Sequence, residues 1–266
     1  MKAAEIALSA LRRSLADFEP ARRKHAAAKF SLGLPALDEP LGGGLARAAL
    51  HEVFAAEGGN AAAAAGFAVG LALRASKIGR KILWVRHELA RLEAGCIYAP
   101  GLAHFGANPD DFILVRARNA ASVFRAGAES LRCSALGAVI IEFWGEPSSL
   151  FLNATRRFSL EAGRSGVSAF LLRAGAKPRP SAAMTRWAVK AVPSTTLAVD
   201  APGHPVFDLT LLRHQQGIPS RSWRVEWNRD QRSFREPSPL SRTVAAVSSN
   251  RPAAADGKFR KLSVVG

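Results

Sequence analysis

The segment 57–62, EGGNAA, joins a strand-like run, HEVF, to a long helix-like run of alanine and larger apolar residues. Adjacent glycines at such a junction are typical of loops whose backbone N–H groups converge on a phosphate. A loop that works on a nucleotide also needs a lysine for the β and γ phosphates and a hydroxyl for Mg²⁺. The loop positions are Glu57, Gly58, Gly59, Asn60, Ala61 and Ala62, which supply neither group. We expect the glycines to keep a bend that the fold requires, with weak phosphate binding at most.

Two carboxylates at the ends of strand-like runs are the other residues that could do chemistry. Glu88 follows the run 81–85, and Glu142 ends the run 138–142. Without a nucleotide or metal beside them, the simplest interpretation is that both end strands at the carboxyl edge of a sheet, with no assigned activity. The six histidines and two cysteines lack metal-ligand spacing, and no nucleophile–histidine–acid set can be drawn from the sequence. We therefore expect no metal, no cofactor and no enzymatic activity.

The elements that must position these residues alternate between strands and helices. Helical stretches lie near 61–76, 119–132 and 149–163. Strand-like runs cover 48–54, 81–85, 112–116, 138–142, 169–172 and 187–191. Strand, crossover helix and strand in repetition predict an α/β fold, a three-layer core around a mostly parallel sheet.

The two ends of the chain differ from this core. Residues 3–18 have helical apolar spacing and predict an amphipathic helix, either a core helix or an arm that docks on a neighbour. Two alternating runs, 206–213 and 222–227, predict an antiparallel hairpin at the edge of the sheet. From residue 236 the sequence is rich in Ser, Pro and Ala and predicts a disordered basic tail. The expected parts are therefore 1–29, 30–233 and 234–266.

Composition limits the class of protein. A chain of 266 residues that is 48% hydrophobic can bury one sizeable core. Its most apolar stretch, 61–73, is shorter than the roughly 20 residues of a membrane span. Charged residues also interrupt the N-terminal run where a signal peptide would need apolar residues. Cys96 and Cys133 have no pairing pattern, which favours reduced thiols. We expect a soluble cytoplasmic protein.

The net charge of +16 is unevenly distributed. Residues 30–150 carry equal numbers of basic and acidic side chains, whereas residues 151–233 carry 13 basic and 5 acidic ones. A basic second half favours a polyanionic partner, with nucleic acid the leading candidate. The alternative is an arginine-rich surface that only keeps the protein soluble.

The stretch 30–53 begins FSLGLPALDEPLGGGL and ends in LHEV. In order and spacing it resembles the entry to the ATPase core of the RecA recombinase family, and the resemblance extends over roughly residues 30–230. It aligns segment 57–62 with the phosphate loop. It also aligns Glu88 with the water-activating glutamate and Glu142 with the magnesium-side carboxylate. The departures at Asn60, Ala61 and Ala62 imply a core without nucleotide turnover.

Two bacterial groups combine a RecA-like core with a defective phosphate loop, the ImuA family and the cell-division inhibitor SulA. The chain length, the entry stretch, the segment WVRHELAR and the basic tail are more similar to ImuA. That resemblance implies a non-catalytic accessory protein of SOS mutagenesis and translesion synthesis. The implied partners are ImuB and an error-prone C-family DNA polymerase, with RecA as a further candidate. A SulA-like division inhibitor and an active DNA-dependent ATPase remain as alternatives.

Weak, non-specific DNA binding is the remaining expectation. RecA-type proteins contact DNA through loops that follow two of their strands, and the segment after Leu172 is short and basic. It offers Arg173, Lys177, Arg179 and Arg186 to phosphates. Tryptophans 144, 187, 223 and 227 lie in or beside predicted strands, where packing within the sheet is a more common role than base stacking.

Overall fold

The structure is a computed structural model that describes residues 28–146, 151–195 and 203–238. The helix expected at 3–18 and the tail expected from 236 onward lie wholly or almost wholly outside these residues. The strands are β1 (Lys29–Phe30), β2 (Leu45–Ala46), β3 (Leu50–Ala55), β4 (Ile82–His87), β5 (Phe112–Ala117), β6 (Ala138–Trp144), β7 (Ser168–Ala174), β8 (Thr185–Val192), β9 (Val206–His214), β10 (Arg221–Asn228) and β11 (Ser233–Arg235). The α-helices are α3 (Pro35–Asp38), α4 (Ala61–Ala75), α5 (Glu88–Ala94), α6 (Ala99–His104), α7 (Ala120–Leu131) and α8 (Phe151–Ser165).

Nine of these strands form one sheet in the order β11-β10-β9-β8-β3-β7-β6-β4-β5. Strands β3 to β8 pair in parallel, while β9, β10 and β11 add an antiparallel end. The expected α/β class, the mostly parallel sheet and the hairpin are confirmed. The small antiparallel pair β1–β2 and the short helices α3, α5 and α6 were not predicted from the sequence.

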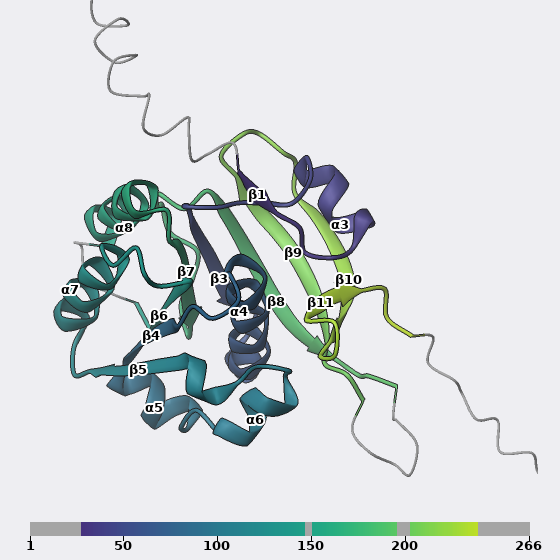
Figure 1. Cartoon of the computed structure of the whole chain (residues 1–266), viewed down its shortest axis with the longest axis horizontal. Helices are drawn as coiled ribbons and strands as arrows, with labels where there is room; N and C mark the ends of the chain where they lie inside the picture. The colour runs from purple at the N-terminus through teal and green to yellow at the C-terminus, as the bar shows by residue number, and fades with distance from the viewer. Residues whose placement is uncertain (1–27, 147–150, 196–202, 239–266) are drawn as a thin grey trace, which may run out of the picture.

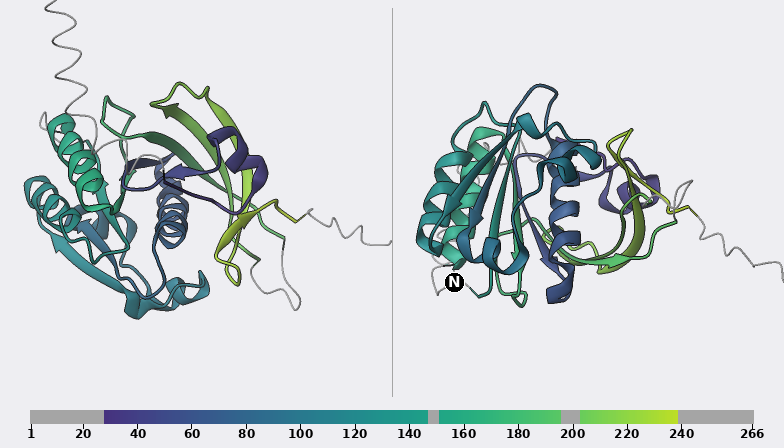
Figure 2. Two further views of the ribbon diagram at one scale, coloured as in Figure 1. Left: turned by 45° about the horizontal axis from the view of Figure 1, so that its top comes forward. Right: turned by 90° about the horizontal axis from the view of Figure 1, so that it is seen from below.

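Helices cover both faces of this sheet (Figure 1). Helices α7 and α8 pack on one face, around a core that includes Val123, Phe158 and Ile141. Helix α4 packs on the other face, and the antiparallel end of the sheet curves around it (Figure 2). Strands β3, β6 and β7, between the two layers, are almost fully buried, as their largely apolar sequences require.

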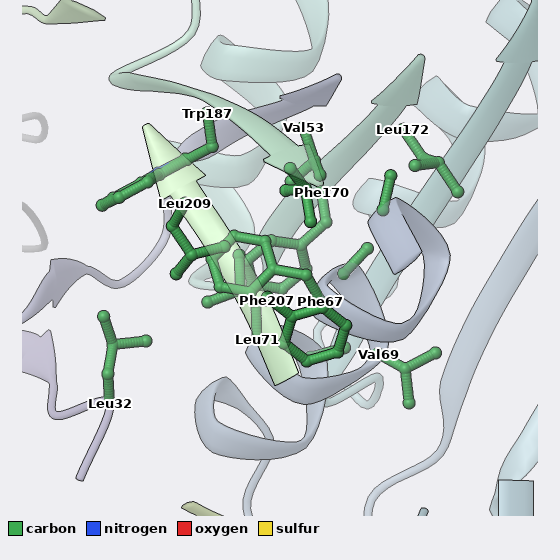
Figure 3. Close-up of a cluster of buried hydrophobic side chains, with 14 of the residues drawn as sticks. Leu32, Val53, Phe67, Val69, Leu71, Phe170, Leu172, Trp187, Phe207 and Leu209 are labelled. Carbon is green, nitrogen blue, oxygen red and sulfur yellow. The ribbon is translucent and has the colours of Figure 1, made fainter. Parts of the chain in front are cut away.

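The larger core forms where α4 meets the sheet. Side chains from α4, β3, β7, β8 and β9 meet there (Figure 3). Phe67 of α4 packs against Trp187 and Phe207, with ring centroids 5.9 and 6.4 Å apart. A Cβ at Gly70 would lie 2.9 Å from the ring of Phe234, so the absence of a side chain lets the helix approach this end of the sheet. Trp187 is wholly buried, which confirms the sequence-based expectation of packing rather than base stacking there.

The entry stretch 30–45 is held by one carboxylate. Asp38 accepts hydrogen bonds from the backbone N–H of Leu32 at 2.8 Å and from the hydroxyl of Ser31 at 2.6 Å. Gly44 has a φ of +113°, and a Cβ there would lie 2.2 Å from the carbonyl oxygen of Phe30. The aspartate and the glycines of this stretch therefore have structural roles that involve no ligand.

Within the described residues, no helix combines the length and apolar character that crossing a membrane requires. Cys96 and Cys133 are both free and exposed.

Candidate functional site

The glycine-containing loop lies between β3 and α4, as predicted. Residues Gly58–Asn60 form a 3₁₀ turn, and α4 begins at Ala61. Neither Gly58 nor Gly59 has a positive φ, and a Cβ on either would meet nothing within 4 Å. The expected bend is present as this turn, but its backbone does not depend on glycine, because a residue with a side chain could adopt the same φ angles.

Asn60 stands where the resemblance places a glycine of the phosphate loop. Its Oδ1 accepts a hydrogen bond of 2.8 Å from the backbone N–H of Ala191, on β8, and the residue is buried. This contact ties the turn to a neighbouring strand. Ala61 and Ala62 follow it in the first turn of α4, with only methyl groups where a lysine and a hydroxyl would be needed.

Glu142, near the carboxyl end of β6, is held by two donors from β4. The indole Nε1 of Trp84 and the Nε of Arg86 donate to its Oε2 at 2.9 and 2.8 Å. Arg86 and Glu142 are direct neighbours in the parallel register, and both side chains are more than 90% buried. Burial raises the pKa of Glu142, and the guanidinium of Arg86 opposes that shift. The carboxylate thus has an internal cation as its partner.

Glu88 lies in a different environment. It is the first residue of α5 and forms a half-exposed ion pair of 2.6 Å with Arg91, one turn further along the helix. Glu88 lines a cavity of about 330 Å³ with His87 and Leu114, whereas Glu142 lines an adjoining cavity between α4 and α6 that shares Arg86, Cys96 and Ile97 with the first. The structure therefore pairs the two predicted carboxylates with different arginines and places them in adjoining cavities.

A shallow cavity of about 500 Å³ lies beside the glycine-containing loop. Gly58 lines it together with the exposed residues Lys177 and Arg179, from the segment after β7. Glu146 organises that segment, because it accepts from the backbone N–H of Lys177 at 2.8 Å and pairs with Arg179 at 2.8 Å. Two of the predicted phosphate contacts thus lie at the surface, close to the loop. Glu146 was not identified from the sequence, where a single acidic residue in a loop gives no signal.

Arg173 and Arg186 are buried, so the prediction that they contact DNA phosphates is wrong. Both pair with Glu52 of β3, at 3.4 and 3.1 Å, and Arg186 also donates to the hydroxyl of Ser181 at 2.8 Å. The guanidinium of Arg173 lies 4.4 Å from the centre of the Phe151 ring. Burial raises the pKa of Glu52, while Ser181 and the two arginines oppose that shift. The role of Glu52 was not predicted from the sequence, because it is a single charged residue within an apolar strand.

Comparisons with protein-family models and with curated proteins found no match. The site must therefore be interpreted from its own chemistry. Among the described residues, no group of three or more His, Cys, Asp or Glu side chains is placed to hold a metal ion. What the site offers is a loop that contains no lysine or arginine, two exposed basic residues beside that loop, and a carboxylate bound to an internal arginine in another cavity.

Proposed function

We propose that this protein is a non-catalytic, RecA-like accessory factor of SOS mutagenesis. It acts as an adaptor between ImuB and an error-prone C-family DNA polymerase during translesion synthesis. The RecA-like part of the proposal rests on the entry stretch 30–45 and on the order of loop, strands and carboxylates along the chain. The parallel sheet with an antiparallel end is compatible with it.

The observation that carries the proposal is the pairing of Glu142 with Arg86 at 2.8 Å. A carboxylate that binds Mg²⁺ beside a nucleotide must present its oxygens to the ion, yet Oε2 of Glu142 already accepts from an arginine and a tryptophan, and the arginine balances its charge. The adjacent loop has Ala61 and Ala62 in place of lysine and hydroxyl. Losing a charge-assisted contact to phosphate costs about 1.5–3 kcal/mol of binding, and the charge that develops during transfer loses more. These features favour a scaffold role over nucleotide turnover.

The partner-binding role is tested by purifying the tagged full-length chain from cells with and without DNA damage. We expect ImuB, the C-family polymerase, or both to be recovered from damaged cells at levels above those in an untagged control. Recovery of the cell-division GTPase alone, with filamentation on overexpression, would replace the proposal with the SulA-like alternative.

A further inference from the structure

A cavity of about 290 Å³ is lined by residues of α4 and of the α5–α6 segment. Its α4 wall is made of small residues, among them Ala61, Ala62 and Ala65. Opposite them, Leu102 and Phe105 come from the α6 region, and both also pack against the main core. The small side chains of α4 leave this space open between otherwise packed elements.

The lining of this cavity includes the carboxylate of Glu142, next to the guanidinium of Arg86. Among the described residues, the hydrogen bonds that reach this carboxylate both end on Oε2, so Oε1 is available to an occupant. Arg86, beside it, has its three nitrogens engaged with Glu142, the carbonyl oxygen of Gly95 and that of Ala90. The cavity therefore presents an acceptor, and three of the five N–H groups of its one arginine already donate to the protein.

These groups define the chemistry of an occupant. The apolar walls favour an apolar body, and the free carboxylate oxygen favours one N–H or O–H donor. A phosphate-bearing molecule is disfavoured, because the carboxylate of Glu142 repels an anion and already balances the charge of Arg86. A strongly cationic group gains little, since Arg86 already balances the charge of Glu142. An indole or a phenol meets both conditions, and Trp84 already makes the same kind of bond to the other oxygen.

The surroundings of the cavity indicate a protein rather than a small solute. Tyr98, which lines the cavity, is 70% exposed, and Leu92, two residues before Ala94 of the lining, is 65% exposed. Large exposed apolar side chains around a pocket are typical of surfaces that bind a protein. The volume is close to the lower limit of about 300 Å³ for ligand pockets and fits a single anchoring side chain.

We propose that this cavity receives a tryptophan or tyrosine side chain of a partner protein, whose N–H or O–H donates to Oε1 of Glu142. The inference rests on the adaptor role proposed above and assigns one contact surface to it. The aromatic ring lies between the alanines of α4 and the Leu102–Phe105 wall, while Tyr98 and Leu92 contact flanking residues of the same partner segment.

The first experiment measures the chemistry of the cavity without the partner. Full-length protein is titrated with N-acetyltryptophanamide and with N-acetylphenylalaninamide, which lacks a side-chain donor, by ligand-observed NMR. We expect the tryptophan probe to bind about tenfold more tightly, the effect of one net hydrogen bond. Equal binding of the two probes, or binding of neither, would overturn the proposal.

Two matched variants locate that binding. Ala62→Phe fills the cavity from the second residue of α4, and Ala121→Phe places the same side chain at the second residue of α7. Both alanines are exposed, so neither change disturbs a packed core. We expect Ala62→Phe to abolish binding of the tryptophan probe and Ala121→Phe to leave it unchanged. Equal effects of the two variants would contradict the location.

The same variants then test the partner contact in the co-purification from damaged cells. Ala62→Phe is expected to reduce partner recovery at least about tenfold, as loss of an anchoring residue does, and Ala121→Phe to retain it. Full recovery with Ala62→Phe would refute the cavity as a contact and leave the adaptor role standing. If the unmodified chain itself recovers no partner, the adaptor role fails, and the proposal that depends on it fails as well, even where the probe binds.

Discussion

Arg86 and Glu142 face each other across adjacent parallel strands, with Nε of the arginine 2.8 Å from Oε2 of the glutamate. The two residues are 56 positions apart in the sequence and more than 90% buried in the fold. The pair gives Glu142 a structural role at the position where the RecA resemblance would place a metal-side carboxylate. It also fixes the orientation of α5, because Arg86 donates to the carbonyl oxygens of Ala90 and Gly95.

The first prediction concerns the stability of this pair. Arg86→Met leaves Glu142 buried without its cation, and we expect the free energy of unfolding to fall by about 3–5 kcal/mol. Adding Glu142→Gln removes the uncompensated charge and is expected to restore part of the loss. Urea denaturation of the single and double variants measures both effects. If the change in the free energy of unfolding of the double variant equals the sum of the changes in the two single variants, the two side chains do not interact.

The second prediction concerns Glu52, which lies between two buried arginines. Glu52→Gln leaves Arg173 and Arg186 close together without a counter-charge, and we expect a loss of about 3–5 kcal/mol in the free energy of unfolding. Glu88→Gln is the matched control, because it makes the same substitution in a half-exposed ion pair and is expected to change stability little. Comparable urea midpoints for the two variants would contradict the structural role of Glu52.

The third prediction follows from the buried His51. Its Nε2–H donates to the carbonyl oxygen of Ala46 at 2.9 Å, and its Nδ1 accepts from the hydroxyl of Thr185 at 2.7 Å. This arrangement fixes one neutral tautomer, because the carbonyl oxygen of Ala46 can only accept and therefore requires the proton on Nε2. Burial lowers the pKa of His51 from 6.5 to about 4.

The pH dependence has a definite sign. Between about pH 6.5 and pH 4 the unfolded chain protonates His51 while the folded chain keeps it neutral. His51 therefore destabilises the fold as the pH falls through that window, by about 3 kcal/mol in total. We expect His51→Gln to show a smaller loss of stability over this range, measured by denaturation at several pH values. An unchanged pH dependence in the variant would contradict the lowered pKa.

The fourth prediction concerns DNA. Lys177 is exposed beside the glycine-containing loop, and we expect Lys177→Ala to weaken binding to single-stranded DNA and to reduce the salt slope by about 0.7. Lys190→Ala, at an exposed lysine on β8, serves as the control and is expected to leave the slope unchanged. Fluorescence anisotropy over a range of salt concentrations measures both. If the affinity for DNA depends on salt concentration with the same slope in both variants, Lys177 does not contact a DNA phosphate.

The sequence allowed the sheet and its long helices to be predicted with small errors in their ends. The run 138–142 corresponds to β6, Ala138–Trp144, because its four consecutive apolar residues, three of them β-branched, favour a buried strand. Helix α6 was missed for a physical reason: it is short and has no buried residue, so it carries no apolar periodicity.

The buried ion pairs could not be predicted from the sequence, because they depend on which strands are neighbours in the sheet. Glu52 lies directly opposite Arg186 in the register of β3 and β8, strands more than 120 positions apart in the chain. Arg173 and Arg186 look like surface residues of a basic segment until that pairing is known. Lys177 and Arg179, from the loop between β7 and β8, were placed correctly at the surface because loops run over the outside of a fold.

The central claim, that the protein turns over no nucleotide, is tested most directly by phosphate release from Mg²⁺–ATP. Purified full-length protein is assayed with and without single-stranded DNA, beside a Glu142→Gln variant that lacks the carboxylate. We expect the two proteins to give the same background rate, with no stimulation by DNA. DNA-stimulated release by the unmodified protein that Glu142→Gln abolishes would contradict the account and establish an active ATPase.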